Sequence, residues 1–430
     1  MFIGVQLTVR ERDFTSESRG EKAISVLLTD TNRWPTPARL AIGLSQAGCC
    51  VSAVCPSSHP LMYTRAVQRV FPYRSLRPLE SLLTAIEATN PQIVIPCDDR
   101  GVQHLHELFA HACSRGAAGR KIADLIERSI GSPESYRITA SRYELLRVAR
   151  EEGIRLPATI LIRTVDDFKT WQTDQVFPWV LKADGSFGGR GVKIARSREE
   201  AEHLFLQMSR PERTARVIKR LIVNRDPFWV RPWWNRCRPA VIAQTYIHGR
   251  PANCAVVCWD GKVLAGICVE VLSSEGATGP ASIVRAVDSP EMMVAAQRIS
   301  SRLGLSGFFG LDFMIEEESR AIHLIEMNPR STPACHLQLG RGRDLIGAFW
   351  SQLSGEAFRE RPPITQKDVI AYFPQAWTSK SNLLSSSFQD IPRGEPSLVQ
   401  ELLRPWPERS ILYRLGHALT AAVSTQKSSN

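Results

Sequence analysis

The sequence predicts an α/β domain with a parallel sheet, followed by a mixed α+β region, and three observations support this prediction. Over residues 24–96, strand-like and helix-like segments alternate, which is typical of parallel sheets with covering helices. Over residues 179–195 and 310–330, apolar segments flank glycine-rich or charged turns, which indicates hairpins. The chain has 430 residues, of which 43% are hydrophobic, so it can bury a large core, and about three domains are expected.

The N-terminal part divides into an arm and a domain. Residues 1–22 are polar and mixed in charge, so we expect a flexible arm. Residues 23–120 are expected to form the α/β domain, with strands over 24–29, 49–55, 67–71 and 92–96 and helices over 37–47 and 79–88. Ligands bind at the carboxyl ends of parallel strands, where the sequence places the polar runs 30–32 and 97–100. Asp98 and Asp99 could contact a substrate there, or they could cap the next helix, which is the commoner role.

The central region, residues 121–350, combines helices with strand pairs. Residues 132–157 are expected to be helical, and Ser197 with Glu200 three residues later predicts a helix that ends near Met208. The segment 210–238 then carries nine basic residues interleaved with four large aromatic ones. It could bind nucleic acid, helped by the net charge of +11, or it could be an insertion that lines a channel for an anionic substrate. We favour the insertion, because no recognisable nucleic-acid-binding fold accompanies it.

Residues 351–430 are expected to form a small C-terminal module. It should contain a strand over 368–373 and helices over 397–403 and 411–423. The last of these is only mildly amphipathic, so packing is favoured over a membrane surface. The chain has no run of about eighteen apolar residues, no signal-peptide pattern and no C-x-x-C pair among its ten cysteines. We therefore expect a cytoplasmic protein with free thiols, while the oligomeric state is not predicted.

The second hairpin carries the most informative polar residues of the chain. If its turn is centred on Ser319, antiparallel pairing places Asp312 directly opposite Glu326. Asn328 follows on the same side because side chains alternate along a strand, and Arg330 lies beside them. The hairpin thus gathers two carboxylates, an amide and a guanidinium on one face.

The same register divides the apolar residues of the hairpin between two faces. The core face should receive Phe313, Ile315, Ile325 and Met327, and the carboxylate face should receive Met314, Ile322 and Leu324. A covered pair of carboxylates is costly without a cation between them. All-oxygen ligation by Asp312, Glu326 and Asn328 suits magnesium or manganese. The alternative is an ordinary solvated pair on an exposed strand, and spacing alone does not decide between the two.

The first hairpin combines a lysine with a glycine-rich turn. Lys182 ends an apolar strand, residues 185–191 contain four glycines, and a second strand follows over 192–195. Backbone N–H groups of such a flap can close on phosphate oxygens, and the lysine supplies a positive charge. The spacing fits neither the dinucleotide fingerprint nor the Walker loop. A surface turn without a ligand is the alternative, and the lysine inside an apolar strand favours a phosphate site.

Taken together, these segments resemble the ATP-grasp superfamily, specifically carboxylate–amine ligases of the carbamoyl-phosphate synthase and biotin carboxylase type. The resemblance rests on the lysine strand with its glycine flap, the strand that ends in Gln244-Thr245-Tyr246-Ile247, and the final motif Asp312…Glu326-Met-Asn-Pro-Arg330. It covers about residues 24–348. It implies an N-terminal domain of the kind that precedes ATP-grasp domains, then two ATP-grasp subdomains with ATP between them.

The resemblance also implies roles for individual residues. ATP would contact Arg142, Lys182, Ser186, Gly188, Gly189, Gly191, Gln244, Thr245, Tyr246 and Ile247. Two magnesium ions, or manganese, would lie between Asp312, Glu326 and Asn328. The catalytic residues would be Lys182, Arg330 and Arg285. Arg330 would face the transferring phosphate, and Arg330 together with Arg285 would hold the acyl phosphate.

Three positions depart from the family pattern, and all concern the nucleotide. Arg142 stands where the family usually has a lysine, and arginine can still bind phosphate. Gln244 replaces an acidic residue that is common at the adenine hinge. Pro251 occupies a position where many members have a glutamate that binds ribose.

The resemblance implies an ATP-dependent ligase that activates a carboxylate as an acyl phosphate for attack by an amine, with release of ADP and phosphate. Both substrates would be small molecules, selected by side chains near Asp30, Asp98, Ser331, Thr332 and His336. Two alternatives stay open. One is a non-catalytic protein that binds nucleotide, or nucleic acid through residues 210–238. The other is a carboxylate kinase that needs no amine.

Overall fold

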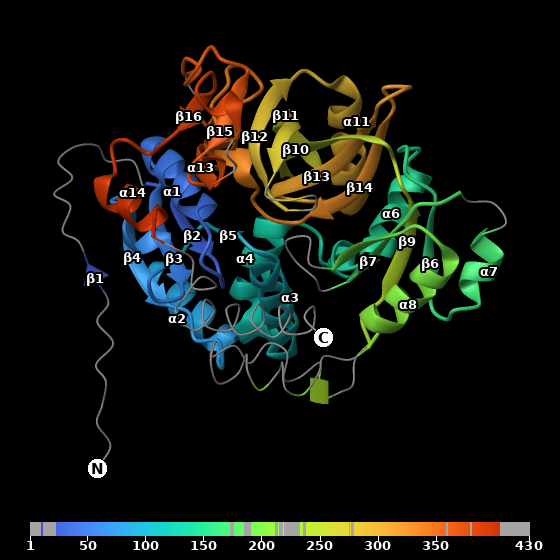
Figure 1. Cartoon of the computed structure of the whole chain (residues 1–430). Coiled ribbons are helices and arrows are strands. Elements are labelled where there is room, and N and C mark those ends of the chain that lie inside the picture. The colour runs from blue at the N-terminus through green and yellow to red at the C-terminus, as the bar shows by residue number, and fades with distance from the viewer. Residues whose placement is uncertain are drawn as a thin grey trace, which may run out of the picture.

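In the computed structural model, the described residues form three sheets, which Figure 1 shows side by side with their helices. It describes residues 10–11, 23–172, 176–184, 191–210, 214, 218, 233–234, 238–274, 276, 279–357, 360–378 and 381–404. The fold is the predicted one: a parallel N-terminal sheet with helices, followed by a smaller and a larger mixed or antiparallel sheet.

The N-terminal sheet has the strand order β1-β4-β3-β2-β5. Its four long strands are parallel, as the alternation of segments predicted: β2 (Ser25–Thr29), β3 (Cys50–Cys55), β4 (Val67–Pro72) and β5 (Ile93–Pro96). Of the expected N-terminal arm, only β1 (Arg10–Glu11) is described, and it pairs antiparallel with β4. The carboxyl ends of β2 and β5 are neighbours, which brings their polar extensions together.

Helices cover both faces of this sheet. They are α1 (Thr36–Gln46), α2 (Pro78–Thr89), α3 (Asp99–Ser114) and α4 (Arg120–Ile130). Leu125 and Ile126 of α4 are buried in one cluster with Leu105, Leu108 and Val94. Helix α4 therefore packs with α3 against the N-terminal sheet.

A connecting region of short helices joins the first domain to the second sheet. It consists of η3 (Pro133–Ser135), α5 (Tyr136–Thr139) and α6 (Arg142–Glu151). Ser141 caps α6 by accepting a hydrogen bond from the N–H of Glu144. The predicted helical segment 132–157 is thus broken before Arg142, and it ends at Glu151.

The smaller sheet has the order β6-β9-β7-β8, and we call it the lid sheet. Its strands are β6 (Thr159–Ile162), β7 (Trp179–Ala183), β8 (Val192–Ala195) and β9 (Val241–Thr245), with α7 (Asp167–Gln172) and α8 (Arg198–Met208) on its apolar face. The helix predicted from Ser197 has the expected start, because this side chain accepts from the N–H of Glu200. Most of residues 210–238 lie outside the described part of the chain, so the two interpretations of that segment stay predictions.

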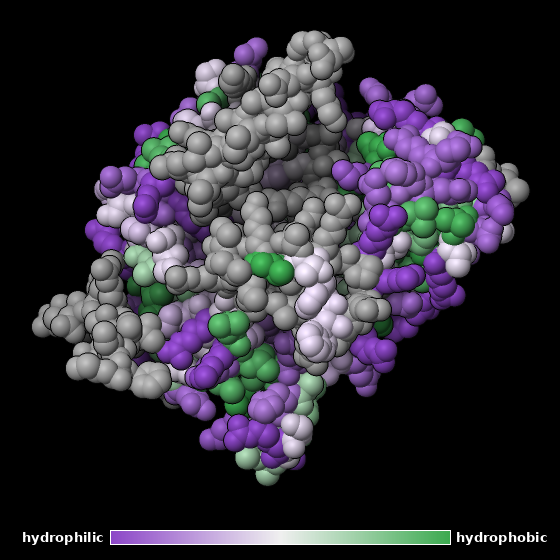
Figure 2. Space-filling model, turned by 60° about the horizontal axis from the view of Figure 1, so that its bottom comes forward, coloured by the Kyte–Doolittle hydropathy of each residue, from purple (hydrophilic) through white to green (hydrophobic). Residues whose placement is uncertain are grey.

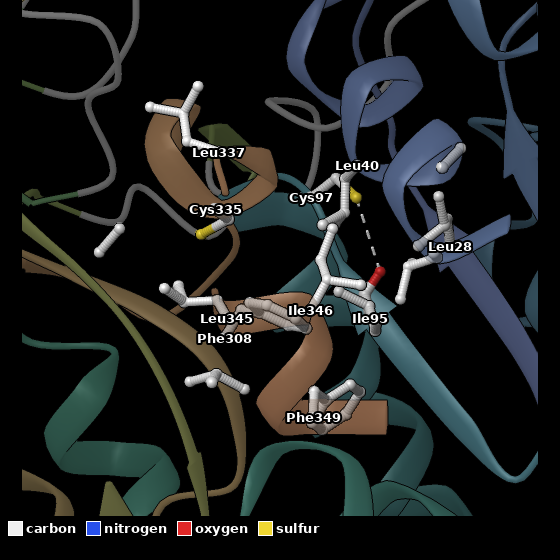
Figure 3. Packing of buried hydrophobic residues seen from close by; sticks show 14 of the residues in the cluster. Leu28, Leu40, Ile95, Cys97, Phe308, Cys335, Leu337, Leu345, Ile346 and Phe349 are labelled. Carbon is white, nitrogen blue, oxygen red and sulfur yellow. Dashed lines mark hydrogen bonds between the residues drawn. The ribbon is translucent and has the colours of Figure 1, made fainter. Parts of the chain in front are cut away.

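The larger sheet has the order β14-β13-β10-β11-β12-β15-β16. Its strands are β10 (Gly249–Trp259), β11 (Lys262–Ser274), β12 (Ala281–Val287), β13 (Gly307–Glu316), β14 (Ile322–Asn328), β15 (Val369–Tyr372) and β16 (Phe388–Asp390). Helices α6 and α11 (Pro290–Leu303) pack on one face. The other face contacts α12 (Leu345–Ser354) and the N-terminal domain. Figure 3 shows this shared core, in which Phe308 and Phe349 lie with Leu40 and Ile95.

The described C-terminal residues join the larger sheet and the N-terminal domain. Strands β15 and β16 extend the larger sheet, and β15 pairs with β12. Helix α14 (Pro396–Leu402) packs through Leu398 and Leu402 against Ala38 of α1. The expected helix over 411–423 lies outside the described residues. The described C-terminal residues thus connect the larger sheet to the N-terminal domain.

On the face shown in Figure 2, hydrophilic side chains predominate and apolar ones lie in small patches. Among the described helices, none is long and apolar enough to cross a membrane.

Candidate functional site

Strands β13 and β14 form the hairpin that the sequence predicted. Asp312 lies directly opposite Glu326, and Asn328 lies opposite Gly310. The amide of Asn328 donates a hydrogen bond to Asp312 Oδ2 at 3.0 Å, so the two side chains share one side of the sheet. The predicted grouping of two carboxylates and an amide is therefore present.

A β-bulge in β14 changes the register on the turn side of this group. Phe313 pairs with Leu324, so Ile325 is an extra residue in the ladder. The prediction that Leu324 lies beside the carboxylates was wrong, because Leu324 is fully buried in the same core as Phe313. The turn closes one residue tighter than expected, with Ile315 opposite Ile322, and the bulge makes up the difference. Ile325 is only half-buried and does not belong to that core.

Asp312 is held by two amide groups. Asn253 of β10 donates to its Oδ1 at 2.6 Å, and Asn328 donates to its Oδ2. Burial raises the pKa of Asp312 to about 6, and the negative charge of Glu326 adds to this shift, although both hydrogen bonds oppose it. The charged form of Asp312 is thus disfavoured in its present surroundings.

Glu326 is neutralised by an arginine instead. Arg142 Nη2 and Nε donate to Glu326 Oε1 at 2.8 and 3.1 Å. Burial acts to raise the pKa of Glu326, but the positive charges of Arg142 and Lys182 outweigh it, so the pKa lies below its ordinary value. Arg142 also donates to the main-chain oxygen of Ala183 at 2.6 Å and lies 3.6 Å from Asp184. One guanidinium thus bridges β14 and the end of β7 in the lid sheet.

Lys182 makes a second bridge between the two sheets. It is buried, and its Nζ donates to the main-chain oxygen of Ile325 at 3.1 Å. Burial lowers the pKa of Lys182 to about 8, with Glu326 opposing the shift and Arg142 adding to it. The bulge therefore supplies the acceptor for the lysine, because its extra residue leaves a main-chain oxygen outside regular pairing.

Arg330 completes the group and connects it to the N-terminal domain. Its Nη2 donates to Asn328 Oδ1 at 3.1 Å, and its Nη1 donates to the main-chain oxygen of Ser331 at 3.3 Å. Its Nε donates to Asp99 Oδ2 at 3.0 Å, and Asp99 is the first residue of α3. The N–H of Ser331 donates to the main-chain oxygen of Pro96 at 3.2 Å. The end of β14 is thereby docked on the carboxyl end of β5.

The carboxylates and the amide fit a divalent cation by their chemistry, after local rearrangement. Magnesium prefers oxygen ligands, and Asp312, Glu326 and Asn328 offer them close together. Each carboxylate is at present satisfied by N–H donors, and the oxygen of Asn328 faces Arg330. A cation between the carboxylates would therefore displace Arg142 from Glu326 and turn the amide of Asn328. Within the described residues, no three or more His, Cys, Asp and Glu side chains are arranged so that they could hold a metal ion on their own.

The expected adenine hinge lies at the end of β9. The N–H of Thr245 donates to the main-chain oxygen of Ala158 at 3.0 Å, and that of Tyr246 donates to Pro178 at 3.2 Å. These two N–H groups are thus hydrogen-bonded within the lid sheet. Main-chain contacts to a nucleobase would therefore be made by the carbonyl groups of Thr245 and Tyr246 and by Ile247.

The remaining predicted nucleotide contacts divide into described and undescribed ones. Gln244 is buried in β9, and its amide donates to Thr159 Oγ1 at 3.1 Å. At the end of the flap, the main-chain oxygen of Gly191 accepts from the N–H of Ala183 at 3.1 Å. Residues 185–190 of the flap, which include the expected contacts Ser186, Gly188 and Gly189, lie outside the described part of the chain.

Arg285 is not brought to this group. It belongs to β12, which β11 and β10 separate from β13. One row of paired residues runs across the sheet from Asp312 through Asn253 and Val269 to Ala286. Arg285 is next to Ala286 in β12, so the side chain of Arg285 points to the face opposite to that of Asp312. Its side chain is exposed and lies opposite Glu270. The sequence could not place it, because strand order determines which positions face the site.

The residues expected to select the substrate fall into two places. At the carboxyl ends of β2 and β5, Asp98 caps α3 by accepting from the N–H of Gly101 at 2.9 Å, which confirms the capping role. Asp98 also accepts from Thr31, and burial with the nearby Asp30 raises its pKa to about 6. Asp30 is fully buried and lies 3.3 Å from His59 Nε2.

The second place is the junction with the C-terminal residues. His336 Nε2 lies 2.7 Å from Asp390 Oδ2 of β16, and Asp390 also pairs with Arg39 of α1. Thr332 begins the short helix η4 (Pro333–His336), and its N–H contacts Cys335 Sγ. His336 thus connects three parts of the chain through Asp390.

Two residues at the site were missed by reasoning from the sequence. Asn253 is the single amide in the apolar run of β10, which is a usable signal, because a lone polar residue in a buried strand needs a partner. Asp99 was considered only as a helix cap or a substrate contact. Its partner Arg330 is 231 residues away, so no local pattern could reveal the pair.

The geometry agrees with the comparisons to known proteins. Residues 139–334 match the family model of the ATP-grasp domain. That range contains β7, β13 and β14, which carry Lys182, Asp312 and Glu326. The chain has an ATP-grasp fold, with an ATP-grasp domain over these residues.

Its relatives are distant. The chain is 21% identical over 203 residues to a carbamoyl-phosphate synthase of Methanobrevibacter smithii, a match that covers 45% of this chain and 46% of that protein. The chain thus spans about half the length of the curated relative that it matches.

Two solved structures support the fold. The biotin carboxylase domain of 2-oxoglutarate carboxylase from Hydrogenobacter thermophilus, solved with MgADP and bicarbonate, superposes with a TM-score of 0.57 at 15% identity and covers 80% of this chain and 72% of that one. An N5-carboxyaminoimidazole ribonucleotide synthetase with ADP superposes with a TM-score of 0.55 at 12% identity and covers 81% of this chain and 80% of that one.

Proposed function

We propose that the protein is an ATP-dependent ligase that activates a small carboxylate as an acyl phosphate and joins it to an amine. The observation that carries this proposal is the convergence of Arg142, Lys182 and Arg330 around Asp312 and Glu326 in an ATP-grasp fold. Three cations beside two carboxylates suit a triphosphate with its metal. The solved neighbours that hold MgADP or ADP agree with this assignment.

The chemistry needs positive charge more than a protein nucleophile. Phosphoryl transfer to a carboxylate brings anions together, and positioning with electrostatic stabilisation supplies most of the catalysis. Lys182 and Arg142 would move from main-chain oxygens and Glu326 to the phosphates. Magnesium held by Asp312, Glu326 and Asn328 would neutralise the phosphate oxygens further.

Arg330 would handle the acceptor side of the reaction. It lies between the carboxylate group and the carboxyl end of β5, where ligands bind in parallel sheets. A carboxylate bound beside it would face the phosphates across the guanidinium. The amine would then attack the acyl phosphate from the side of the N-terminal domain, and phosphate would leave.

The proposal is tested by ADP release from purified protein. The protein is incubated with ATP and magnesium, and a panel of amino acids and organic acids is added one at a time. We expect that one class of acid stimulates ADP release, and that an amine increases it further. If no acid in the panel stimulates release above the rate with ATP alone, the ligase assignment loses its support.

Dependence on the amine separates the ligase from a carboxylate kinase. In both cases an acyl phosphate forms, and hydroxylamine traps it as a hydroxamate. A ligase should release ADP slowly without its amine, whereas a kinase should turn over fully with the acid alone.

A further inference from the structure

We infer that Asp99 of the N-terminal domain is a positioning residue for Arg330, so that a domain outside the ATP-grasp match completes the phosphate-handling site. The inference rests on the proposed function and extends it. Asp99 lies outside residues 139–334, and its contact with Arg330 joins the start of α3 to the segment that follows β14.

The contact is specific in its atoms. Asp99 Oδ2 accepts from Arg330 Nε at 3.0 Å, and Asp99 is the one charged partner of the guanidinium within the described residues. Arg330 uses one N–H of each terminal nitrogen for Asn328 and Ser331. A guanidinium has five N–H donors, so two of them have no acceptor in the described part of the chain. Holding Nε fixes the plane in which these two donors point.

Asp99 itself is firmly placed. It is the first residue of α3, and the preceding Asp98 caps the helix through Gly101. The neighbouring main-chain bond from Ser331 to Pro96 ties the same two segments together. The side chains of Arg330 and Asp99 are 23% and 26% exposed, so the pair is not sealed in a core and can face a ligand. A rigid support of this kind preorganises a site.

The alternative is that Asp99 only neutralises Arg330 and competes with phosphate for it. The two roles predict opposite signs. Removing a competing anion makes the surroundings of Arg330 more positive and tightens anion binding. Removing a positioning anchor loosens the guanidinium and weakens anion binding in spite of the more positive field.

The experiment measures binding of inorganic phosphate in the presence of MgADP by calorimetry, together with acid-dependent ADP release. The variants are Asp99→Ala, Asp99→Asn, Arg330→Ala and the double variant, with Asp124→Asn on an exposed position of α4 as the control. We expect Asp99→Ala to weaken phosphate binding and slow turnover by about tenfold. Asp99→Asn, whose amide oxygen still accepts from Nε, should recover to within about threefold of the wild type.

The double variant decides whether the effect passes through Arg330. Residues that act as a unit are not additive, so Asp99→Ala should change little further once Arg330 is alanine. The inference is overturned if Asp99→Ala tightens phosphate binding, if its effect is equally large without Arg330, or if the wild type binds no phosphate. Failure of the ligase proposal looks different: no acid stimulates ADP release, while the phosphate affinities still follow the expected order.

Discussion

Replacing Glu326 by glutamine tests the metal and nucleotide assignment directly. The substitution keeps the shape of the side chain but removes the charge that balances Arg142 and Lys182. Arg142 contacts Glu326 Oε1 through two donors, at 2.8 and 3.1 Å. Hydrogen bonds to charged groups contribute about 1.5 to 3 kcal/mol, and the glutamine oxygen can still accept both of them, but without the charge. The side chains of Arg142 and Glu326 are 16% and 23% exposed. After solvent screening, we therefore expect the free energy of unfolding to decrease by about 1 to 2 kcal/mol.

This loss corresponds to a decrease of about 2 to 8 °C in the Tm of a domain of the size matched by the ATP-grasp family. Activity should respond far more strongly, because the carboxylate is proposed to hold the cation in the transition state. We expect acid-dependent ADP release to decrease at least about a hundredfold. Glu318→Gln, at an exposed position in the turn of the same hairpin, is the matched control. Turnover of Glu326→Gln within about threefold of this control would refute the assignment.

Three further predictions concern the surroundings of the site. Arg142→Ala should weaken MgATP binding by calorimetry about tenfold and lower the Tm, whereas Arg147→Ala on the exposed side of the same helix should do neither. Burial lowers the pKa of His106 from 6.5 to about 4, so the unfolded chain takes up a proton at a higher pH than the folded state. The free energy of unfolding should therefore decrease as the pH falls from about 6.5 to 4, and chemical denaturation of His106→Phe should show a smaller decrease. Gly131 has a φ of 96° and would bring a Cβ within 2.2 Å of a backbone oxygen, so Gly131→Ala should destabilise by more than about 2 kcal/mol in thermal unfolding. Gly116→Ala, with positive φ but open space, should cost only about 1 kcal/mol, and equal losses in the two variants would contradict the steric argument.

The parts of the site that could be predicted from the sequence depend on local alternation. The opposition of Asp312 and Glu326 follows from two apolar segments and a charged turn, and the structure has this pairing. The lysine strand and the helix that begins after Ser197 are likewise set by residues a few positions apart. Local rules suffice where the partners lie on one hairpin or in one helical turn.

The parts that could not be predicted depend on distant segments. Asn253 reaches Asp312 across 59 residues, and Asp99 reaches Arg330 across 231. Arg285 lies away from the carboxylate group because of the order of strands in the sheet, and no local sequence pattern reveals that order. The pairing register next to the turn differs by one residue from the register of Asp312 and Glu326, and the bulge at Ile325 accommodates this difference.

The bulge at Ile325 has different consequences for the side chain at this position and for the length of β14. Lys182 contacts the main-chain oxygen of Ile325, so the side chain at this position is free to drift without loss of the contact. The number of residues in β14 is not free in the same way. Deleting one residue here would leave Asp312 opposite Glu326 and Phe313 opposite Leu324 in a regular ladder. Lys182 would then lose the main-chain oxygen that it contacts. A deletion at position 325 should therefore be harmful, although a change of the apolar side chain there should not be.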